Sequence, residues 1–124
     1  YETYQLPYSA LEREHETWID RAADTGAGII IRGGVGRGEP GLGLGQQDRW
    51  HLWDAAKLDE LLEEGETRTG FLLRFTLSHP NLSTTIVGTM KPEHLLENVR
   101  VAEKGRLPAD VYAEAKRRLD SVVK

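Results

Sequence analysis

The sequence predicts an α/β fold in which parallel strands alternate with helices. Short strand-like segments are separated by longer segments that carry apolar residues at helical spacing, an order typical of strand–helix–strand units. The middle strand contains a continuous β-branched run, Ile29–Ile31, which indicates burial on both faces, as in a parallel sheet or a barrel. A closed eight-stranded barrel takes about 250 residues. The 124-residue chain is therefore close to half of one.

Glycine and proline set most of the element boundaries. We expect strands over residues 1–6, 29–31 and 84–87, and helices over residues 11–24, 48–64, 67–78, 92–104 and 108–122. A glycine-rich loop follows the second strand from Gly33 to Gly45. The tryptophans Trp50 and Trp53 lie three residues apart on a helix and are expected to pack in the core.

Composition excludes several classes of function. Hydrophobic residues make up 39% and charged residues 29% of the chain, as in a soluble, core-forming domain. The net charge of −4 gives no general attraction to nucleic acid, and no apolar run is long enough to cross a membrane. Without cysteine there is no disulfide, thiolate metal site or thiol nucleophile, which suits the cytoplasm. We expect residues 1–124 to form one region of a longer protein, because the sequence opens in a strand-like segment.

Two glycine-containing turns are candidates for binding phosphate. The segment from Gly36 to Gly41 formally matches G-x-G-x-x-G, but Pro40 and the glycines that follow do not support the helix that a dinucleotide site needs. The turn from Gly88 to His94 precedes a helix, and it carries a hydroxyl at Thr89 and a positive charge at Lys91. Helix N-termini favour anions, so this turn suits a phosphate. A capped turn with an exposed lysine is the alternative.

Metal and nucleophile sites have little support in the sequence. None of the four histidines has the spacing of a zinc pair, and no Ser–His–Asp set can be assembled from spacing. We expect three of them, His15, His51 and His94, to be solvated on helices. We expect the fourth, His79 before Pro80, to serve a turn or cap. Charged runs such as residues 116–118 are expected to be solvated helix faces.

Four segments together resemble the aldo-keto reductases. Residues 5–9 (Gln-Leu-Pro-Tyr-Ser), 28–32 (Gly-Ile-Ile-Ile-Arg) and 85–89 (Thr-Ile-Val-Gly-Thr) occur in the order of the last three strands of that family's barrel. Residues 71–80 resemble the helix before the final strand. The most specific part is the I-V-G-T…E-x-L-x-E-N run over residues 86–98. The resemblance implies the C-terminal half of a (β/α)8 TIM barrel that reduces carbonyls with NADPH and without a metal.

The resemblance also implies which residues hold the cofactor. Gln5 matches the residue that binds the nicotinamide carboxamide, and Arg32 and Gly33 follow the strand that flanks the nicotinamide and pyrophosphate. The remaining positions match the 2′-phosphate site (Thr89, Met90, Lys91 and His94) and the adenine contacts (Glu97 and Asn98).

The family's catalytic aspartate, tyrosine, lysine and histidine come from its first four strands, which this sequence lacks. Neither Tyr8 nor Lys91 lies at a matching position. We therefore expect the chain to be inactive alone, and to act on a small-molecule carbonyl substrate only with an N-terminal half-barrel or a second copy. A non-enzymatic half-barrel that self-associates and a small nucleotide-binding module are the alternatives.

Overall fold

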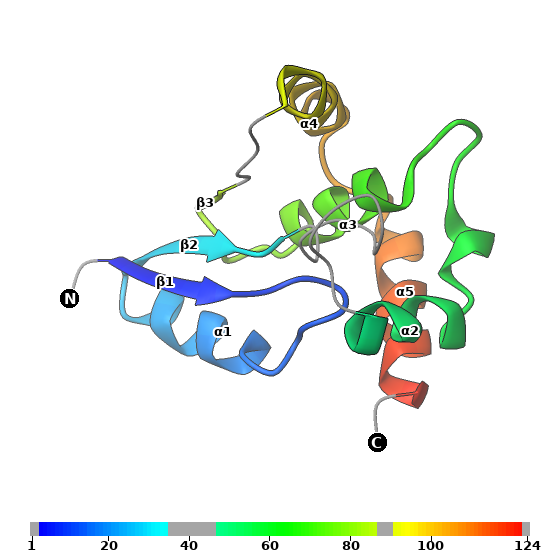
Figure 1. Ribbon diagram of the computed structural model, residues 1–124. Helices are drawn as coiled ribbons and strands as arrows, with labels where there is room; N and C mark the ends of the chain where they lie inside the picture. The colour runs from blue at the N-terminus through cyan, green and yellow to red at the C-terminus, as the bar shows by residue number, and fades with distance from the viewer. Residues whose placement is uncertain (1–2, 35–46, 87–90, 123–124) are drawn as a thin grey trace.

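The computed structural model describes residues 3–34, 47–86 and 91–122, and it contains a three-stranded parallel sheet (Figure 1). The strands β1 (Thr3–Pro7), β2 (Gly28–Arg32) and β3 (Thr84–Thr85) lie in the order β1-β2-β3. In this register Gln5 lies opposite Ile30, and Ile30 lies opposite Thr84. Together with the helices between the strands, this confirms the predicted α/β fold.

The helices account for most of the rest of the described chain. They are α1 (Glu16–Asp24), α2 (Gln47–Ala55), the 3-10 turn η1 (Leu58–Leu61), α3 (Arg68–Leu77), α4 (Pro92–Lys104) and α5 (Ala109–Val122). Helices α3, α4 and α5 lie close to their predicted ranges, because the residues at their starts act as helix-start signals. The hydroxyl of Thr67 accepts a hydrogen bond from the Gly70 N–H, and Pro92 takes the first turn of α4.

Two predicted helices were wrong in their extent. Helix α1 begins at Glu16 and not at Leu11, because the hydroxyl of Ser9 binds the Leu11 N–H and Ser9 pairs with Glu12 across a tight turn. Helix α2 stops at Ala55 and does not continue to residue 64, because Lys57 adopts a left-handed backbone with φ 54°.

The predicted strands also differ at their ends. Pro7 lies within β1 and does not end it. Because β1 is an edge strand, it tolerates a residue that lacks an N–H. β3 is short, and residue 87, its predicted last member, lies outside the described residues, as does most of the glycine-rich loop.

The core lies on one face of the sheet. Ile29 and Ile31 are fully buried there, and Leu6 packs against the same cluster. Figure 1 shows α1 running beneath β1 and β2, with α3 and α5 beyond them. Trp50 and Trp53 are 3% and 0% exposed, which confirms their predicted place in the core.

The opposite face of the sheet is polar and accessible. Side chains alternate along a strand, so this face carries the residues between the buried isoleucines. Gln5, Arg32 and Thr84 are exposed on it, and Ile30 is half-buried. Within the described part of the chain, the sheet is thus covered on one side only.

Candidate functional site

The carboxyl ends of the three strands meet at one edge of the sheet, because all three run parallel. Binding sites of α/β folds lie at this edge. Gln5 and Arg32 lie on neighbouring strands, on the same accessible face, and Arg32 ends β2. The structure therefore brings these two predicted cofactor residues together.

The backbone leaves β2 through two glycines in a tight space. Gly33 has a φ of 70°, which favours glycine over any residue with a Cβ. Gly34 is buried, and a Cβ at this position would lie 2.9 Å from the Thr85 Oγ1. The hydroxyl of Thr76 on α3 donates a 2.8 Å hydrogen bond to the Gly34 carbonyl. α3 and β3 thus hold the exit of β2 in a fixed position at the carboxyl edge.

The second predicted cofactor segment is at the start of α4. Lys91 is exposed and forms the N-cap, where its carbonyl accepts the N–H groups of His94 and Leu95 at 3.0 and 3.2 Å. His94 is exposed one turn into the helix, which confirms that it is solvated. Thr89 and Met90 lie outside the described residues.

Glu97 and Asn98 lie further along α4 and are half-buried. A carboxylate oxygen of Glu97 is 3.7 Å from a guanidinium nitrogen of Arg100, one turn away. The predicted contacts of Glu97 and Asn98 with the adenine remain a prediction.

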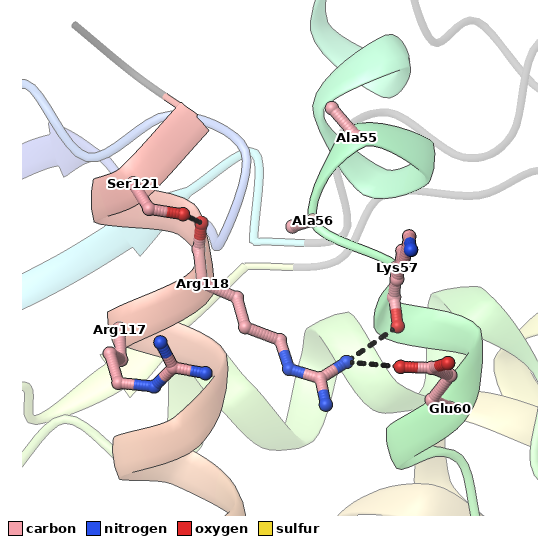
Figure 2. Close-up of a pocket in the computed structure, with 7 residues that line it drawn as sticks. All are labelled: Ala55, Ala56, Lys57, Glu60, Arg117, Arg118 and Ser121. Carbon is pink, nitrogen blue, oxygen red and sulfur yellow. Dashed lines mark hydrogen bonds and ion pairs between the residues drawn. The ribbon is translucent and has the colours of Figure 1, made fainter.

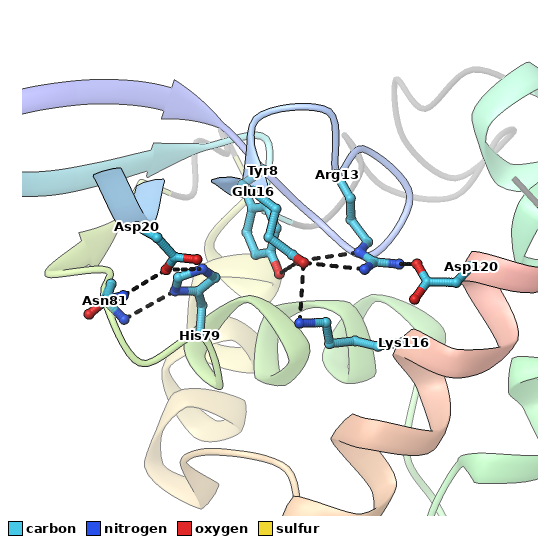
Figure 3. Close-up of polar contacts among 8 residues, drawn as sticks. All are labelled: Tyr8, Arg13, Glu16, Asp20, His79, Asn81, Lys116 and Asp120. Carbon is cyan, nitrogen blue, oxygen red and sulfur yellow. Dashed lines mark hydrogen bonds and ion pairs between the residues drawn. The ribbon is translucent and has the colours of Figure 1, made fainter. Parts of the chain in front are cut away.

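A partly buried polar cluster lies on the other face of the sheet, among the helices (Figure 3). The Tyr8 hydroxyl donates a 2.7 Å hydrogen bond to Glu16, which also binds Arg13 at 3.2 Å and Lys116 at 3.2 Å. Arg13 reaches Asp120 on α5 at 2.7 Å. The cluster thereby connects the end of β1 to α1 and α5.

This cluster contains a tyrosine and a lysine, yet its electrostatics do not suit proton donation. Burial, with the nearby Glu16 carboxylate, raises the pKa of Tyr8 above its ordinary value, whereas a donor to a carbonyl needs a lowered one. Burial opposes ionisation of Glu16, but the hydrogen bonds from Arg13 and Tyr8 outweigh it and lower the pKa of Glu16 to about 2. We conclude that the cluster holds elements together.

His79 serves a turn, as the sequence predicts. It is 3% exposed, its Nδ1 accepts the Asn81 N–H at 3.1 Å, and its Nε2 lies 3.6 Å from Asp20 (Figure 3). Burial lowers the pKa of His79, although the carboxylates of Asp20 and Glu16 oppose that shift. The neutral ring therefore fixes the turn between α3 and β3.

Sequence patterns did not predict this cluster as a whole, because most of its members lie far apart in the chain. Arg13 and Glu16 are three residues apart, and theirs was the one ion pair of the cluster that the sequence spacing could have indicated. The expectation that residues 116–118 form a solvated face holds for Arg117, which is exposed, but not for Lys116 and Arg118, which are half-buried in ion pairs.

A surface cavity of about 270 Å³ lies between α2, η1 and α5, away from the sheet (Figure 2). The guanidinium of Arg118 crosses it and donates 2.9 Å hydrogen bonds to the Lys57 carbonyl and to Glu60. None of the predicted cofactor residues that the structure describes lines it; its lining is Ala55, Ala56, Lys57, Glu60, Arg117, Arg118 and Ser121.

The described residues contain neither a metal-ligand cluster nor a membrane-spanning helix. No group of three histidine, aspartate or glutamate side chains among them could hold a metal ion. None of the helices in the same residues is long and apolar enough to cross a membrane. The G-x-G-x-x-G segment at 36–41 lies outside the described part of the chain.

Comparison with known proteins gives matches among solved structures. No protein-family model and no curated protein matches the chain. The aldo-keto reductase AKR11C1 from Bacillus halodurans, in its apo form, matches with a TM-score of 0.74 and 21% identity, over 94% of this chain and 43% of its own. Its holo form matches with a TM-score of 0.72 and 22% identity, over 99% of this chain and 41% of its own.

These matches are informative about the fold. The chain spans about two fifths of the length of the structures that it matches. Its three parallel strands and alternating helices correspond to part of an α/β barrel. The fold of this chain is therefore that of part of an aldo-keto reductase barrel.

Proposed function

We propose that the chain is the cofactor-holding part of an NADP(H)-dependent oxidoreductase that reduces a small-molecule carbonyl by hydride transfer. One observation carries this proposal: Gln5 and Arg32 lie on the same accessible face of neighbouring strands, with Arg32 at the carboxyl end of β2, in a sheet whose fold matches part of an aldo-keto reductase. The carboxamide of Gln5 can pair with the nicotinamide amide. Arg32 brings a positive charge to the same face, suited to a pyrophosphate.

The remaining contacts are assigned to the segment that leads into α4. Lys91 supplies a charge and the N-terminus of α4 carries a partial positive charge, both of which favour the 2′-phosphate of NADP(H). Beside Lys91, we assign Thr89, Met90 and His94 to the same phosphate. Gly33 is assigned to the pyrophosphate, and Glu97 and Asn98 to the adenine.

The proton donor is assigned to the rest of the barrel. Reduction of a carbonyl needs a donor within hydrogen-bond reach of its oxygen. In the described residues Tyr8 is buried on the helix side of the sheet, with a raised pKa, so it does not meet this need. An N-terminal half-barrel would supply the missing aspartate, tyrosine, lysine and histidine. We expect the whole enzyme in the cytoplasm.

The assignment of Lys91 is tested by cofactor titration. The chain is titrated separately with NADPH and NADH, and binding is followed by the fluorescence of the reduced nicotinamide. A charge-assisted hydrogen bond contributes about 1.5–3 kcal/mol, so Lys91→Ala should weaken NADPH binding at least about tenfold. NADH lacks the 2′-phosphate, and its affinity should stay unchanged.

Lys104→Ala is the matched control, because it removes the same charge from the other end of α4. It should leave both affinities unchanged. If millimolar NADPH does not bind, or if the two variants weaken it equally, the cofactor assignment is wrong. The chain alone should not oxidise NADPH in the presence of a carbonyl, and oxidation should begin when the rest of the barrel is added.

A further inference from the structure

The backbone that leads through Arg32 is hydrogen-bonded to the elements on both sides of β2. The Ile31 carbonyl accepts the Ile86 N–H at 2.8 Å and the Thr85 hydroxyl at 3.2 Å, both from the β3 side. The Arg32 carbonyl accepts the Tyr8 N–H at 3.1 Å, from the β1 side. Two consecutive carbonyl groups are therefore fixed where the chain reaches the carboxyl edge of the sheet.

Two threonine side chains extend this arrangement beyond the end of the strand. Thr76 on α3 is 0% exposed, and its hydroxyl donates a 2.8 Å hydrogen bond to the Gly34 carbonyl. A Cβ at Gly34 would lie 2.9 Å from the Thr85 Oγ1 and 3.2 Å from the Thr76 Cγ2, so both threonines lie directly against this glycine. We call Thr76 and Thr85 the threonine clasp.

The hydroxyl of Thr76 makes a contact that its own helix does not require. Threonine hydroxyls within helices commonly bond the carbonyl four residues earlier in the same helix. Thr76 instead bonds Gly34, which is 42 residues away in the chain. A valine would fill the same buried space without a hydroxyl. The hydrogen bond therefore serves the exit of β2 and not the helix.

We propose that the threonine clasp positions Arg32 and Gly33 for the pyrophosphate of a dinucleotide, with Thr76 as the positioning residue. This inference rests on the proposed function, in which Arg32 and Gly33 contact that group. Fixing the backbone on both sides of the arginine lowers the entropy that is lost when the ligand binds.

The clasp also controls where a carbonyl dipole lies. A carbonyl oxygen carries a partial negative charge, which repels a nearby phosphate. The Gly34 carbonyl is directed at the Thr76 hydroxyl, inside the protein. Without that hydroxyl the peptide group can turn, and the left-handed φ of 70° at Gly33 shows that the chain here follows a path that glycine permits.

The test is Thr76→Val, which removes the hydroxyl and keeps the branched shape. The chain is titrated with NADH, NADPH and adenosine 2′-monophosphate, and binding is followed by calorimetry. Both dinucleotides should bind about three- to tenfold more weakly, the effect of one neutral hydrogen bond. Adenosine 2′-monophosphate has no pyrophosphate, so its affinity should stay unchanged.

Two control variants separate the hydroxyl from the substitution itself. Thr76→Ser keeps a hydroxyl and should retain the affinity for both dinucleotides. Thr69→Val makes the same change about two turns earlier on α3 and should leave all three affinities unchanged. Equal binding of NADH by Thr76→Val and the unchanged chain overturns the proposal. So does an equal loss for adenosine 2′-monophosphate, because that result indicates a general effect on the fold.

Backbone order gives a readout that needs no cofactor. Amide ¹⁵N relaxation in the free chain should show lower order parameters for Gly33 and Gly34 in Thr76→Val, but not in Thr76→Ser. Unchanged order parameters overturn the proposal. If circular dichroism shows that Thr76→Val does not fold, Thr85→Val takes its place. Its effects should be smaller and in the same direction, because the Ile31 carbonyl keeps the Ile86 N–H.

The same measurements distinguish this proposal from the proposed function. If the unchanged chain binds neither NADH nor NADPH, the proposed function fails. The order parameters then decide alone whether Thr76 holds the backbone at Gly33 and Gly34. If both dinucleotides bind but Thr76→Val changes neither their affinity nor the backbone order, the proposed function stands and the threonine clasp is wrong.

Discussion

Lys57 shows how one backbone conformation changes the course of the chain. It follows α2 with φ 54° and ψ 44°, a left-handed conformation that residues with a Cβ adopt at a cost. Its N–H binds the Asp54 carbonyl at 3.1 Å, and its own carbonyl accepts a hydrogen bond from Arg118. Lysine thus occupies a position after a helix where glycine is preferred.

We predict that Lys57→Gly stabilises the protein. Glycine adopts this conformation without a steric penalty, so the free energy of unfolding should rise by about 1 kcal/mol, measured by urea denaturation. Lys57→Ala is the matched control: it removes the same ammonium group but keeps the Cβ, so stability should change little. An equal gain in both variants would show that the lysine charge, and not the backbone, is the source.

Sequence patterns predicted residues whose roles are local. Trp50 and Trp53 were placed in the core by spacing, and His79 in a turn by the proline that follows it. The contacts of Glu16 could not be predicted, because its partners Tyr8 and Lys116 are brought to it by the tertiary fold. Ion pairs of this kind leave no periodic signal in a sequence.

At the scale of elements, α1 is held to the rest of the molecule by a charged connection as well as by the core. Ile19 buries the apolar side of α1, whereas Glu16 at its first turn binds Tyr8, Arg13 and Lys116. Three separate parts of the chain therefore meet at one carboxylate. Losing its charge should weaken the contact between α1 and α5.

We predict a pH-dependent stability that depends on Glu16. Its pKa falls from 4.5 to about 2 on folding, so the stabilisation is complete above pH 4.5 and is lost as the pH falls toward 2. Allowing for solvent screening, the loss is about 1–2 kcal/mol. The difference in unfolding free energy between the unchanged chain and Glu16→Gln should be largest near neutral pH and should shrink on acidification.

Glu64→Gln is the control for this prediction, because Glu64 lies at an exposed position in a turn. Its difference from the unchanged chain is the baseline with which the difference for Glu16→Gln is compared at each pH. A constant difference for Glu16→Gln would contradict the assigned pKa.

Element boundaries show where prediction from sequence succeeds. α4 was predicted well because Pro92 and Gly105 are unambiguous start and stop signals. α2 was predicted too long because the apolar pattern continues through the residues of η1, while the break at Lys57 carries no glycine or proline. At the candidate site, the placement of Gln5 and Arg32 on one face of neighbouring strands follows from the parallel sheet, but the tight space around Gly34 depends on α3 and could not be foreseen.

At the scale of the whole molecule, the described sheet has one central strand and two outer strands. β2 is bonded on both sides, whereas β1 and β3 each have one described partner. The face that carries Gln5 and Arg32 is accessible, whereas Ile29 and Ile31 on the other face are fully buried. The proposed cofactor site therefore lies on the face that the described helices leave accessible.

This asymmetry predicts the pattern of amide hydrogen exchange in the isolated chain. Central strands open only with the global unfolding of a domain, whereas edge strands open locally. We expect the amide of Ile31 in β2 to exchange with a free energy close to that of global unfolding, measured by NMR at neutral pH. The amides of β1 should exchange faster, although β1 is as long as β2, because β1 has a described neighbour on only one side.

Exchange is measured at several protein concentrations as a control. Equal protection of β1 and β2 at every concentration would mean that the outer edge of β1 is already covered within the chain, which would contradict an open sheet.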